Sequence, residues 1–358
     1  MEHLHSEPME SISLARGVPA PECLPEQELA DCARTVLARD GKTILSYGSG
    51  AGYMPLRELI GEWFEVDPSR VVLTNGALQG FVLLAQYFGR GQTVFVETPT
   101  YDRPLKILLE NGINVVPVGM DEHGMIPAEL EDALRRNEPP AFLYTIPTFQ
   151  NPSGRTIPEQ RRRRIVELAR ADGVTILEDD PYGRIRFEGE TPPAIFELSR
   201  ETTIYTSSFS KTVAPGLRVG WYIFPAPLAA AVIERANATY ITPVLLGQAV
   251  VHEFIRRGSF EPNLRRVIDL LRLRRDAMLA ALARHFPGAT WSHPQGGYFI
   301  WLELPQGTVA KDVLARAEGV TAVLGTDFGG EDNTLRLAYS YVSPEEIELG
   351  IERLPAAV

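Results

Sequence analysis

The stretch Tyr205-Thr-Ser-Ser-Phe-Ser-Lys211-Thr-Val-Ala-Pro-Gly-Leu-Arg218-Val-Gly-Trp221 runs from one predicted strand (203–206) into the next (219–224). It places Lys211 among serine hydroxyls and Arg218 after a Pro-Gly turn. An amine attacks a carbonyl only when it is deprotonated, and a pocket with cationic neighbours favours that form. A guanidinium beside serine hydroxyls binds a phosphate monoester. The stretch fits a Schiff-base lysine beside an anion site; the alternative is a solvated lysine in a serine-rich loop.

Apolar segments that favour strands alternate with helical patterns around this stretch. The strands fall near 71–74, 93–97, 114–118, 141–146, 174–178, 203–206 and 219–224. Such alternation predicts an α/β fold with a mainly parallel central sheet flanked by helices. After about residue 245 the pattern changes to two long helices, 246–258 and 262–285, and then to mixed strands and helices, which predicts a smaller α+β domain.

Polar and aromatic residues follow the C-terminal ends of the predicted strands, where an open α/β sheet binds its ligands. They are Asn75-Gly76, Tyr101, Asn151, Asp179, Tyr182 and Lys211. Taken singly each has an ordinary structural explanation, such as a strand-turn-helix joint at Gly76. Together with the amine and the anion site they indicate pyridoxal 5′-phosphate (PLP), which offers an aldehyde and a phosphate. Arg336 lies on a later predicted strand, opposite its leucine neighbours, as either a surface arginine or a carboxylate clamp.

The pattern divides the chain into three parts. Residues 1–44 are expected to form an N-terminal arm and a helix that join the small domain. Residues 45–245 would be the large PLP-binding domain and residues 246–358 the small C-terminal α+β domain. The first dozen residues, with His3 and His5, are expected to be a loose polar arm without a metal role.

Composition narrows the class of protein. The chain has 358 residues, 44% hydrophobic and 23% charged, which is typical of a globular protein. Its formal net charge of -11 argues against nucleic acid as a partner. Two cysteines, Cys23 and Cys32, indicate neither a disulfide framework nor a metal site. No secretory signal and no apolar run of about 18 residues occurs, so we expect a cytoplasmic protein without a membrane contact.

With these stretches assembled, the sequence resembles the fold-type I PLP-dependent aminotransferases of class I/II. It is most similar to the 2-aminoadipate and kynurenine aminotransferase branch, which also supplies the effector half of MocR-type regulators. The motifs that carry the resemblance are Tyr47 with Gly52-Tyr53-x-Pro-Leu-Arg57, Thr74-Asn-Gly-Ala-Leu-Gln79, Pro99-Thr-Tyr101, Gln150-Asn-Pro-Ser-Gly154, Glu178-Asp-Asp-Pro-Tyr182, Ser208-Phe-Ser-Lys211, Pro215-Gly-Leu-Arg218 and Gly296-Gly-Tyr-Phe-Ile-Trp301.

The resemblance implies a role for each site residue. Lys211 would bind the cofactor aldehyde and later move the proton between the substrate Cα and the cofactor. Asp179 would pair with the pyridine nitrogen, Tyr182 and Asn151 with the phenolic oxygen, and Tyr101 would stack on the ring. The phosphate would be held by the turn Gly76-Ala77-Leu78, by Ser208 and Ser210, and by Arg218. Arg336 would bind the substrate α-carboxylate, and Tyr47 would reach the phosphate of the neighbouring subunit in a homodimer.

Three positions depart from the family pattern. Ala77-Leu78 stands where relatives carry Ser-Gln, so only backbone N–H groups remain there. Arg16 replaces a glycine near the substrate pocket, where it would either bind a second substrate carboxylate or form a surface salt bridge. The segment 323–330 is shorter than the usual loop before the arginine strand, so donor specificity does not transfer.

The resemblance implies an aminotransferase that uses an L-amino acid (glutamate or 2-aminoadipate, aromatic or branched) and a 2-oxo acid such as 2-oxoglutarate. The alternatives are another PLP reaction on this fold, namely a β-lyase, decarboxylase or oxidase, or a non-catalytic PLP-binding sensor domain. The lack of a winged helix-turn-helix before Ile12 and the acidic charge count against the sensor.

Overall fold

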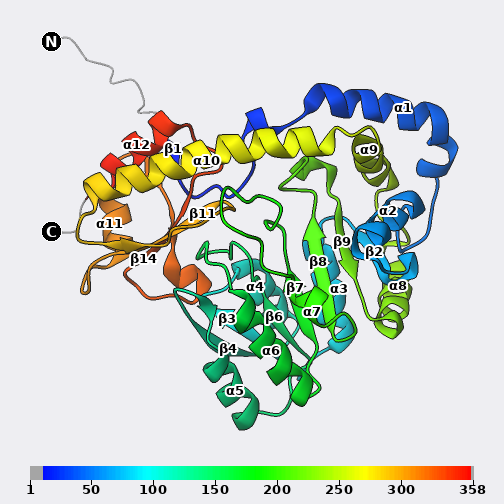
Figure 1. Cartoon of the computed structure of the whole chain (residues 1–358), viewed down its shortest axis with the longest axis horizontal. Coiled ribbons are helices and arrows are strands. Elements are labelled where there is room, and N and C mark those ends of the chain that lie inside the picture. Colours follow the sequence, from blue (N-terminus) through cyan, green and yellow to red (C-terminus); the bar gives the residue numbers. More distant parts are fainter. Residues whose placement is uncertain (1–10, 356–358) are drawn as a thin grey trace.

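The computed structural model describes residues 11–355, and Figure 1 shows the arrangement of their helices and strands. The predicted loose arm with His3 and His5 lies outside the described residues. Two sheets organise the chain, one of eight strands and one of four. A third pairing, between β1 (Ile12–Ser13) and β12 (Val320–Thr321), ties the beginning of the described chain to its C-terminal part.

The eight-stranded sheet confirms the predicted α/β fold. Its strand order is β2-β9-β8-β7-β6-β3-β4-β5, and the pairs from β8 across to β4 are parallel. The edge strands β2 and β5 and the inserted β9 run antiparallel to their neighbours. The strands are β2 (Val71–Thr74), β3 (Thr93–Thr98), β4 (Asn114–Asp121), β5 (Gly124–Met125), β6 (Phe142–Thr145), β7 (Ile176–Asp179), β8 (Thr203–Ser208) and β9 (Gly220–Ile223).

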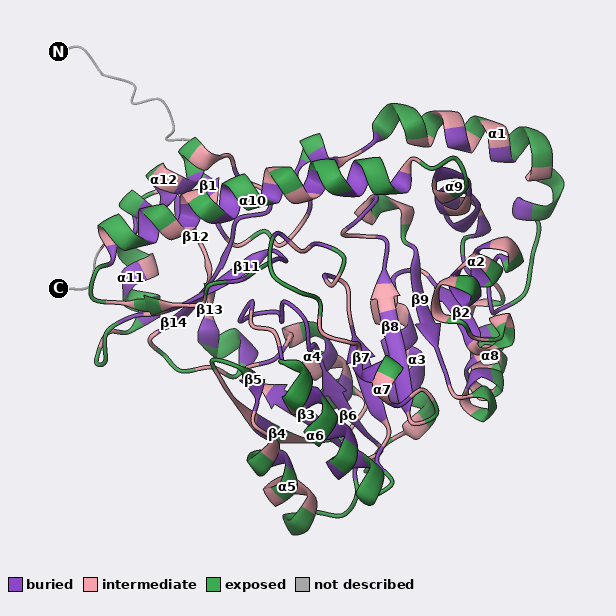
Figure 2. Ribbon diagram, in the orientation of Figure 1, coloured by how far each residue is buried: buried purple, intermediate pink, exposed green. Residues whose placement is uncertain are grey.

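Helices cover both faces of this sheet because its central strands are apolar on both sides. One buried cluster joins one face to α3 (Ala77–Phe88), α4 (Asp102–Glu110) and α8 (Ala226–Tyr240). Another joins the opposite face to α5 (Pro127–Arg136), α6 (Glu159–Ala171) and α7 (Ile195–Leu198). Figure 2 shows the strands of this sheet mostly buried, while the outer faces of α5 and α6 are exposed.

The four-stranded antiparallel sheet has the order β10-β11-β14-β13. Its strands are β10 (Thr290–Trp291), β11 (Phe299–Glu303), β13 (Val323–Leu324) and β14 (Thr334–Ala338). The long helix α10 (Phe260–His285) packs against α12 (Pro344–Glu352), and α11 (Ala310–Arg316) follows β11 in the chain. Short 3-10 turns complete the chain at η1 (Pro21–Cys23), η2 (Pro68–Arg70), η3 (Pro215–Leu217) and η4 (Gly325–Phe328).

Residues 11–18, which we call the strap, cross from the small sheet to the edge of the large one. The strap is held by hydrogen bonds to its backbone: Ala338 N donates to Leu14 O at 2.7 Å. The Ser340 hydroxyl donates to Val18 O at 2.9 Å. Gly17 is required because a Cβ there would lie 2.6 Å from the Phe299 ring. The strap therefore forms a wall between the two sheets.

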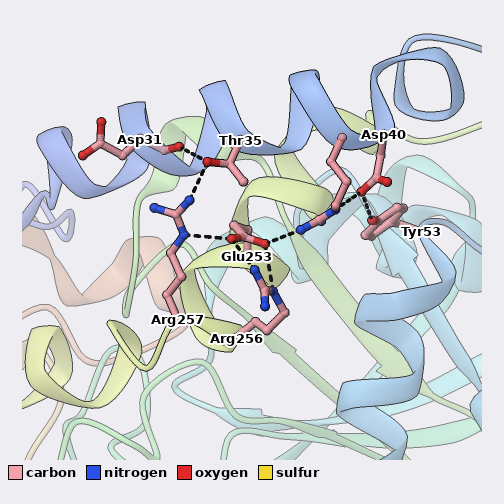
Figure 3. A network of polar contacts seen from close by, with 8 residues as sticks. Asp31, Thr35, Asp40, Tyr53, Glu253, Arg256 and Arg257 are labelled. Carbon is pink, nitrogen blue, oxygen red and sulfur yellow. Dashed lines mark hydrogen bonds and ion pairs between the residues drawn. The ribbon is translucent and has the colours of Figure 1, made fainter.

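The helix α1 (Glu26–Ile44) leads from the strap to α2 (Met54–Phe64) and packs along α9 (Leu245–Arg256). A buried carboxylate fastens this contact: Glu253, with no exposed side-chain surface, accepts hydrogen bonds from Arg39 at 2.9 Å and from Arg256 and Arg257 at 2.8 Å. These bonds, that from Arg256 foremost, lower the pKa of Glu253 to about 2. Figure 3 shows the network, which reaches Tyr53 through Asp40.

The structure adds detail that the sequence pattern does not predict. Helix α1 continues to Ile44, the last residue of the expected N-terminal part, and α8 (Ala226–Tyr240) follows the last predicted strand of the large domain in a segment for which no element is predicted. The short segment 323–330 forms β13 and a 3-10 turn. Among residues 11–355, no helix is long and apolar enough to cross a membrane.

Candidate active site

A cavity of about 390 Å³ opens at the C-terminal edge of the parallel strands, between the large sheet and the strap. The six predicted edge positions and the anion site meet here. Of the sequence-predicted site residues, those lining it are Gly76, Ala77, Leu78, Tyr101, Asn151, Asp179, Tyr182, Ser208, Ser210, Lys211, Arg218 and Arg336.

Lys211 follows β8 and projects toward the strap. Its Nζ donates to Gly17 O at 2.7 Å and lies 5.2 Å from the centre of the Tyr298 ring. Burial, and then the charges of Arg336 and Arg218, lower the pKa of Lys211 to about 8. A lysine held in this way is partly deprotonated near neutral pH, as a carbonyl-reactive amine must be.

Asp179 ends β7 at the floor of the cavity. The Tyr144 hydroxyl donates to Asp179 Oδ2 at 2.8 Å, whereas Oδ1 is buried and has no hydrogen-bond partner within the described chain. Burial raises the pKa of Asp179 to about 7, and the Tyr144 hydrogen bond opposes that shift. A buried unpaired carboxylate oxygen facing a cavity is costly unless a ligand donates to it.

The anion site combines backbone and side-chain groups. Arg218 adopts a left-handed conformation (φ 55°), and its Nη2 donates to Asn75 O at 3.1 Å. Gly76 has φ 86°, and a Cβ there would lie 2.2 Å from that same nitrogen. Helix α3 begins at Ala77, so its first N–H groups face an anion together with the positive end of the helix dipole. The hydroxyls of Ser208 and Ser210 bond each other at 2.9 Å on the same wall.

Arg336 on β14 enters the cavity from the small sheet. Its guanidinium lies 4.4 Å from the centre of the Phe299 ring and 4.9 Å from that of Phe328. Nη1 donates to Asn151 Oδ1 at 3.0 Å and Nη2 to Ala15 O at 2.8 Å, while the buried Nε has no partner in the described chain. The aromatic contacts fix the plane of the guanidinium, which suits bidentate binding of a carboxylate.

Two tyrosines line the cavity between these charged groups. Tyr101 is the N-cap of α4, and burial raises its pKa to about 12. Tyr182 packs against Tyr298 and Phe299 with ring centres 5.3 and 5.8 Å apart, and burial raises its pKa as well. Both phenols are therefore neutral, so they can donate hydrogen bonds or stack but carry no charge.

Two predicted site residues do not line the cavity. Tyr47 is 81% exposed on the surface of the chain. Arg16 is exposed in the strap, and its guanidinium lies 4.0 Å from the centre of the Tyr341 ring. Among residues 11–355, no group of three or more histidine, cysteine or acidic residues could hold a metal.

The residues of the cavity fit PLP. The unpaired Asp179 oxygen matches the protonated ring nitrogen of PLP, and the Arg218 and α3 donors match its phosphate. Lys211 has its amine in the same cavity, where an aldehyde would need it. A parallel α/β sheet carrying this set at its C-terminal edge defines a PLP-dependent transferase.

Comparison with known proteins supports the same class of protein. The profile of the family "Aminotransferase class I and II" matches residues 11–354. A 2-aminoadipate transaminase of Thermus thermophilus is 38% identical, over 97% of this chain and 90% of the relative. An aromatic-amino-acid aminotransferase of Thermococcus litoralis is 34% identical, over 97% of this chain and 88% of the relative.

Solved structures of aminotransferases have the same fold as this chain. The α-aminoadipate aminotransferase LysN of Thermus thermophilus, in complex with N-(5′-phosphopyridoxyl)-L-leucine, superimposes with a TM-score of 0.91 at 36% identity, covering 96% of this chain and 91% of that one. The kynurenine aminotransferase of Pyrococcus horikoshii, in complex with PMP, gives 0.92 at 33% identity, covering 96% and 90%. The chain belongs to the class I and II aminotransferase family and is a PLP-dependent aminotransferase.

The sequence pattern assigns no role to several residues that line the cavity or contact its lining. Tyr144 is the clearest: a tyrosine within an apolar predicted strand signals a buried hydroxyl that must find a partner. Phe299 belongs to the motif Gly296-Gly-Tyr-Phe-Ile-Trp301, but its contact with Arg336 depends on the pairing of β11 with β14. Asp102 and Arg103 also line the cavity, and nothing in their local pattern sets them apart from a solvated helix start.

Proposed function

We propose that this aminotransferase moves an amino group between an L-amino acid and a 2-oxo acid, 2-oxoglutarate being the first acceptor to test. The observation that carries the proposal is that the Lys211 amine, the unpaired Asp179 oxygen and the Arg336 guanidinium converge on one cavity. Among the relatives, a 2-aminoadipate transaminase at 38% identity and an aromatic-amino-acid aminotransferase at 34% favour transamination over a β-lyase, decarboxylase or oxidase. Transcriptional regulators also match the chain, at 32% identity or less, so the sensor function is the less favoured alternative.

In this mechanism PLP supplies an electron sink that stabilises negative charge at the substrate Cα. Lys211 would hold the cofactor through its Nζ, and once that amine is free it would carry the proton that leaves the substrate Cα. Arg336 holds the α-carboxylate and so orients the Cα–H bond toward Lys211. The strap and the aromatic walls exclude water from that proton transfer.

The remaining cofactor contacts follow the lining of the cavity. Asp179 would accept from the ring nitrogen, and Tyr182 and Asn151 would bind the phenolic oxygen. Tyr101 would stack on the ring. The phosphate would lie against the N–H groups of the Gly76-Ala77-Leu78 turn and the Ser208, Ser210 and Arg218 side chains.

The apolar part of the cavity lining favours a donor with an aromatic or branched side chain. Val18, Pro104 and Ile146 contribute to this lining with Tyr101 and Phe299. Acidic donors such as glutamate or 2-aminoadipate are the second class. Arg16 supports them because it lies in the strap next to Gly17 and Val18, and Arg103 supports them because it lines the cavity. For Arg16 to reach a second carboxylate it must leave the Tyr341 ring.

We propose a homodimer in which Tyr47 reaches the partner's cofactor phosphate. Exposed apolar side chains on one chain support this assembly: Leu45, Tyr47, Ile241 and Val244. An apolar groove of about 310 Å³ between α3 and α8 is lined by Leu78, which also lines the cavity. A second copy covering this surface would complete the site from outside.

Mixed dimers test that assignment. The Lys211→Ala and Tyr47→Ala homodimers are each expected to have impaired activity. When the two variants are mixed and allowed to exchange subunits, the mixed dimers are expected to recover part of the activity. Restoration requires that Tyr47 act across the interface, since the chain that keeps Lys211 has lost its own Tyr47. No gain in dimers shown to have exchanged would contradict the assignment.

The division at 44/45 and 245/246 remains our proposal for the domains. The two sheets support it, although the packing of α9 against α2 favours a second boundary nearer Gly258. We further propose a cytoplasmic enzyme without a nucleic-acid partner, because the net charge of -11 would repel phosphate backbones.

Absorption spectroscopy tests the proposed reaction. The purified protein should carry the band of covalently bound PLP, and Lys211→Ala should abolish it. One amino acid of a panel should convert the band to that of the pyridoxamine form, and 2-oxoglutarate should reverse the change. Loss of the amino acid without a reversible pyridoxamine form would indicate one of the other PLP reactions instead.

A further inference from the structure

The two carboxylate oxygens of Asp179 have different surroundings. Oδ2 accepts a 2.8 Å hydrogen bond from the Tyr144 hydroxyl, and Oδ1, buried beside the cavity, has no partner in the described chain. The side chain of Asp179 thus has one hydrogen bond within residues 11–355, and it comes from a residue that does not line the cavity. The torsion of the carboxylate, and hence the direction of Oδ1, depends on that bond.

Tyr144 is itself firmly held. It lies on β6, has no exposed surface, and packs edge-on against Phe81 of α3 with ring centres 5.3 Å apart. Strand β6 pairs in parallel with β7, whose last residue is Asp179. A buried hydroxyl with a single acceptor and a ring fixed by its neighbours can orient that acceptor.

We propose that Tyr144 is a positioning residue that aims Asp179 Oδ1 at the ring nitrogen of PLP and keeps the Asp179 carboxylate ionised there. The proposal rests on the proposed role of Asp179 as the partner of that nitrogen.

The groups around Asp179 explain why a donor is needed. Glu97 from β3 and Asp180 from the same chain segment are acidic, and both raise the pKa of Asp179 in addition to burial. The phenols of Tyr101, Tyr182 and Tyr222 also lie within its electrostatic reach. Within residues 11–355, the Tyr144 hydrogen bond is the one interaction that lowers the pKa of Asp179. Without it, the shared proton would move from the ring nitrogen to the carboxylate, and the ring would lose its positive charge.

The adjacent residue provides a matched control. The Tyr205 hydroxyl donates to Asp180 Oδ2 at 2.8 Å, so it makes a tyrosine–aspartate hydrogen bond of the same length, here partly buried, one position along the chain. Asp180 and Tyr205 line a separate small cavity, of about 120 Å³, and not the one that holds Lys211. Tyr205→Phe therefore removes an equivalent bond without touching the proposed cofactor contact.

The experiment compares the binding of PLP with that of an analogue whose ring nitrogen is replaced by carbon, both measured by titration of the apoprotein. The wild-type protein should prefer PLP by about ten- to hundredfold, the value of one charge-assisted hydrogen bond. Tyr144→Phe should reduce this preference toward one, and Tyr205→Phe should leave it unchanged. With ¹⁵N-labelled PLP, the ring-nitrogen resonance should lie at the protonated position in the wild type and shift toward the neutral one in Tyr144→Phe.

The outcomes separate the two proposals. If the wild-type protein shows no preference for PLP, the proposed role of Asp179 fails, and the role of Tyr144 fails with it. If the wild type discriminates and Tyr144→Phe discriminates equally, only the role of Tyr144 is overturned.

If Tyr144→Phe does not fold, as judged by circular dichroism of the apoprotein, 3-fluorotyrosine incorporated at position 144 replaces it. Its hydroxyl is the stronger donor, so the preference for PLP should rise. An unchanged preference would contradict the proposal.

Discussion

Replacing Gly76 by alanine should weaken PLP binding more than it weakens the fold. The residue combines φ 86° and ψ 153°, a region that L side chains rarely occupy. An added Cβ would lie 2.2 Å from Arg218 Nη2 and 2.9 Å from its Cζ. Gly76→Ala must therefore both strain the turn and push the guanidinium out of the anion site.

The two effects have different magnitudes. Backbone strain of this kind costs about 1–3 kcal/mol, and the smaller entropy of the unfolded alanine chain offsets about 0.4–1 kcal/mol of it. The net loss of apoprotein stability is then about 1–2 kcal/mol. Displacing Arg218 removes charge-assisted bonds to the phosphate, so the affinity for PLP should fall by about 10- to 100-fold in addition.

Urea denaturation of the apoprotein and titration with PLP measure the two effects separately. Gly216→Ala is the control, because it lies in the same loop as Arg218, has no positive φ, and has nothing within 4 Å of an added Cβ. It should leave both quantities almost unchanged. Wild-type affinity for PLP in Gly76→Ala would refute the steric argument, whatever the change in stability.

Three further predictions follow from the geometry. Arg336→Lys keeps the charge but loses the planar guanidinium between Phe299 and Phe328. The KM for the amino acid, measured by half-reaction kinetics, should therefore rise about 10- to 100-fold with a smaller change in kcat. An unchanged KM would contradict carboxylate binding at Arg336. The pKa of Lys211 is lowered to about 8, so the free amine appears around that pH. The rate at which the apoprotein captures PLP should rise with pH over the same range. A midpoint near the ordinary pKa of 10.5 would contradict Lys211 as the reacting amine. Glu253→Gln should cost about 2–3 kcal/mol at pH 7 in urea denaturation and leave PLP affinity unchanged. Since the folded-state pKa of Glu253 is about 2 against an ordinary 4.5, this difference should shrink as pH falls from 4.5 toward 2, and a constant difference would argue against the ion-pair network.

The sequence predicts the fold and most of the cavity lining for a common physical reason. Parallel strands end at one edge, so residues that follow strand ends, such as Tyr101, Asn151 and Asp179, come together without any knowledge of tertiary contacts. Lys211 and Arg218 belong to one loop, and their spacing is fixed locally. The position of Arg336 in the cavity could be predicted only from the family resemblance, because it depends on how one sheet packs against the other.

Contacts between distant segments could not be predicted in the same way. The hydroxyl of Tyr144 meets Asp179 because β6 and β7 pair in a particular register. The carbonyls of Ala15 and Gly17 meet Arg336 and Lys211 because Ala338 and Ser340 hold the strap in place. The stacking of Arg16 on Tyr341 likewise depends on the path of the strap. The sequence alone therefore could not show whether the Arg16 side chain lies on the surface or in the substrate pocket.

The position of Arg336 links substrate binding to the basicity of Lys211. Its guanidinium is one of two cations that lower the pKa of Lys211, the other being Arg218. A substrate carboxylate on Arg336 would neutralise part of that charge, and a phosphate on Arg218 would do the same there. Each arriving anion therefore raises the affinity of Nζ for a proton. In the proposed mechanism, Lys211 would lose its proton more readily before the anions bind. It would be a stronger base once the Cα–H bond lies beside it, when proton abstraction would require one.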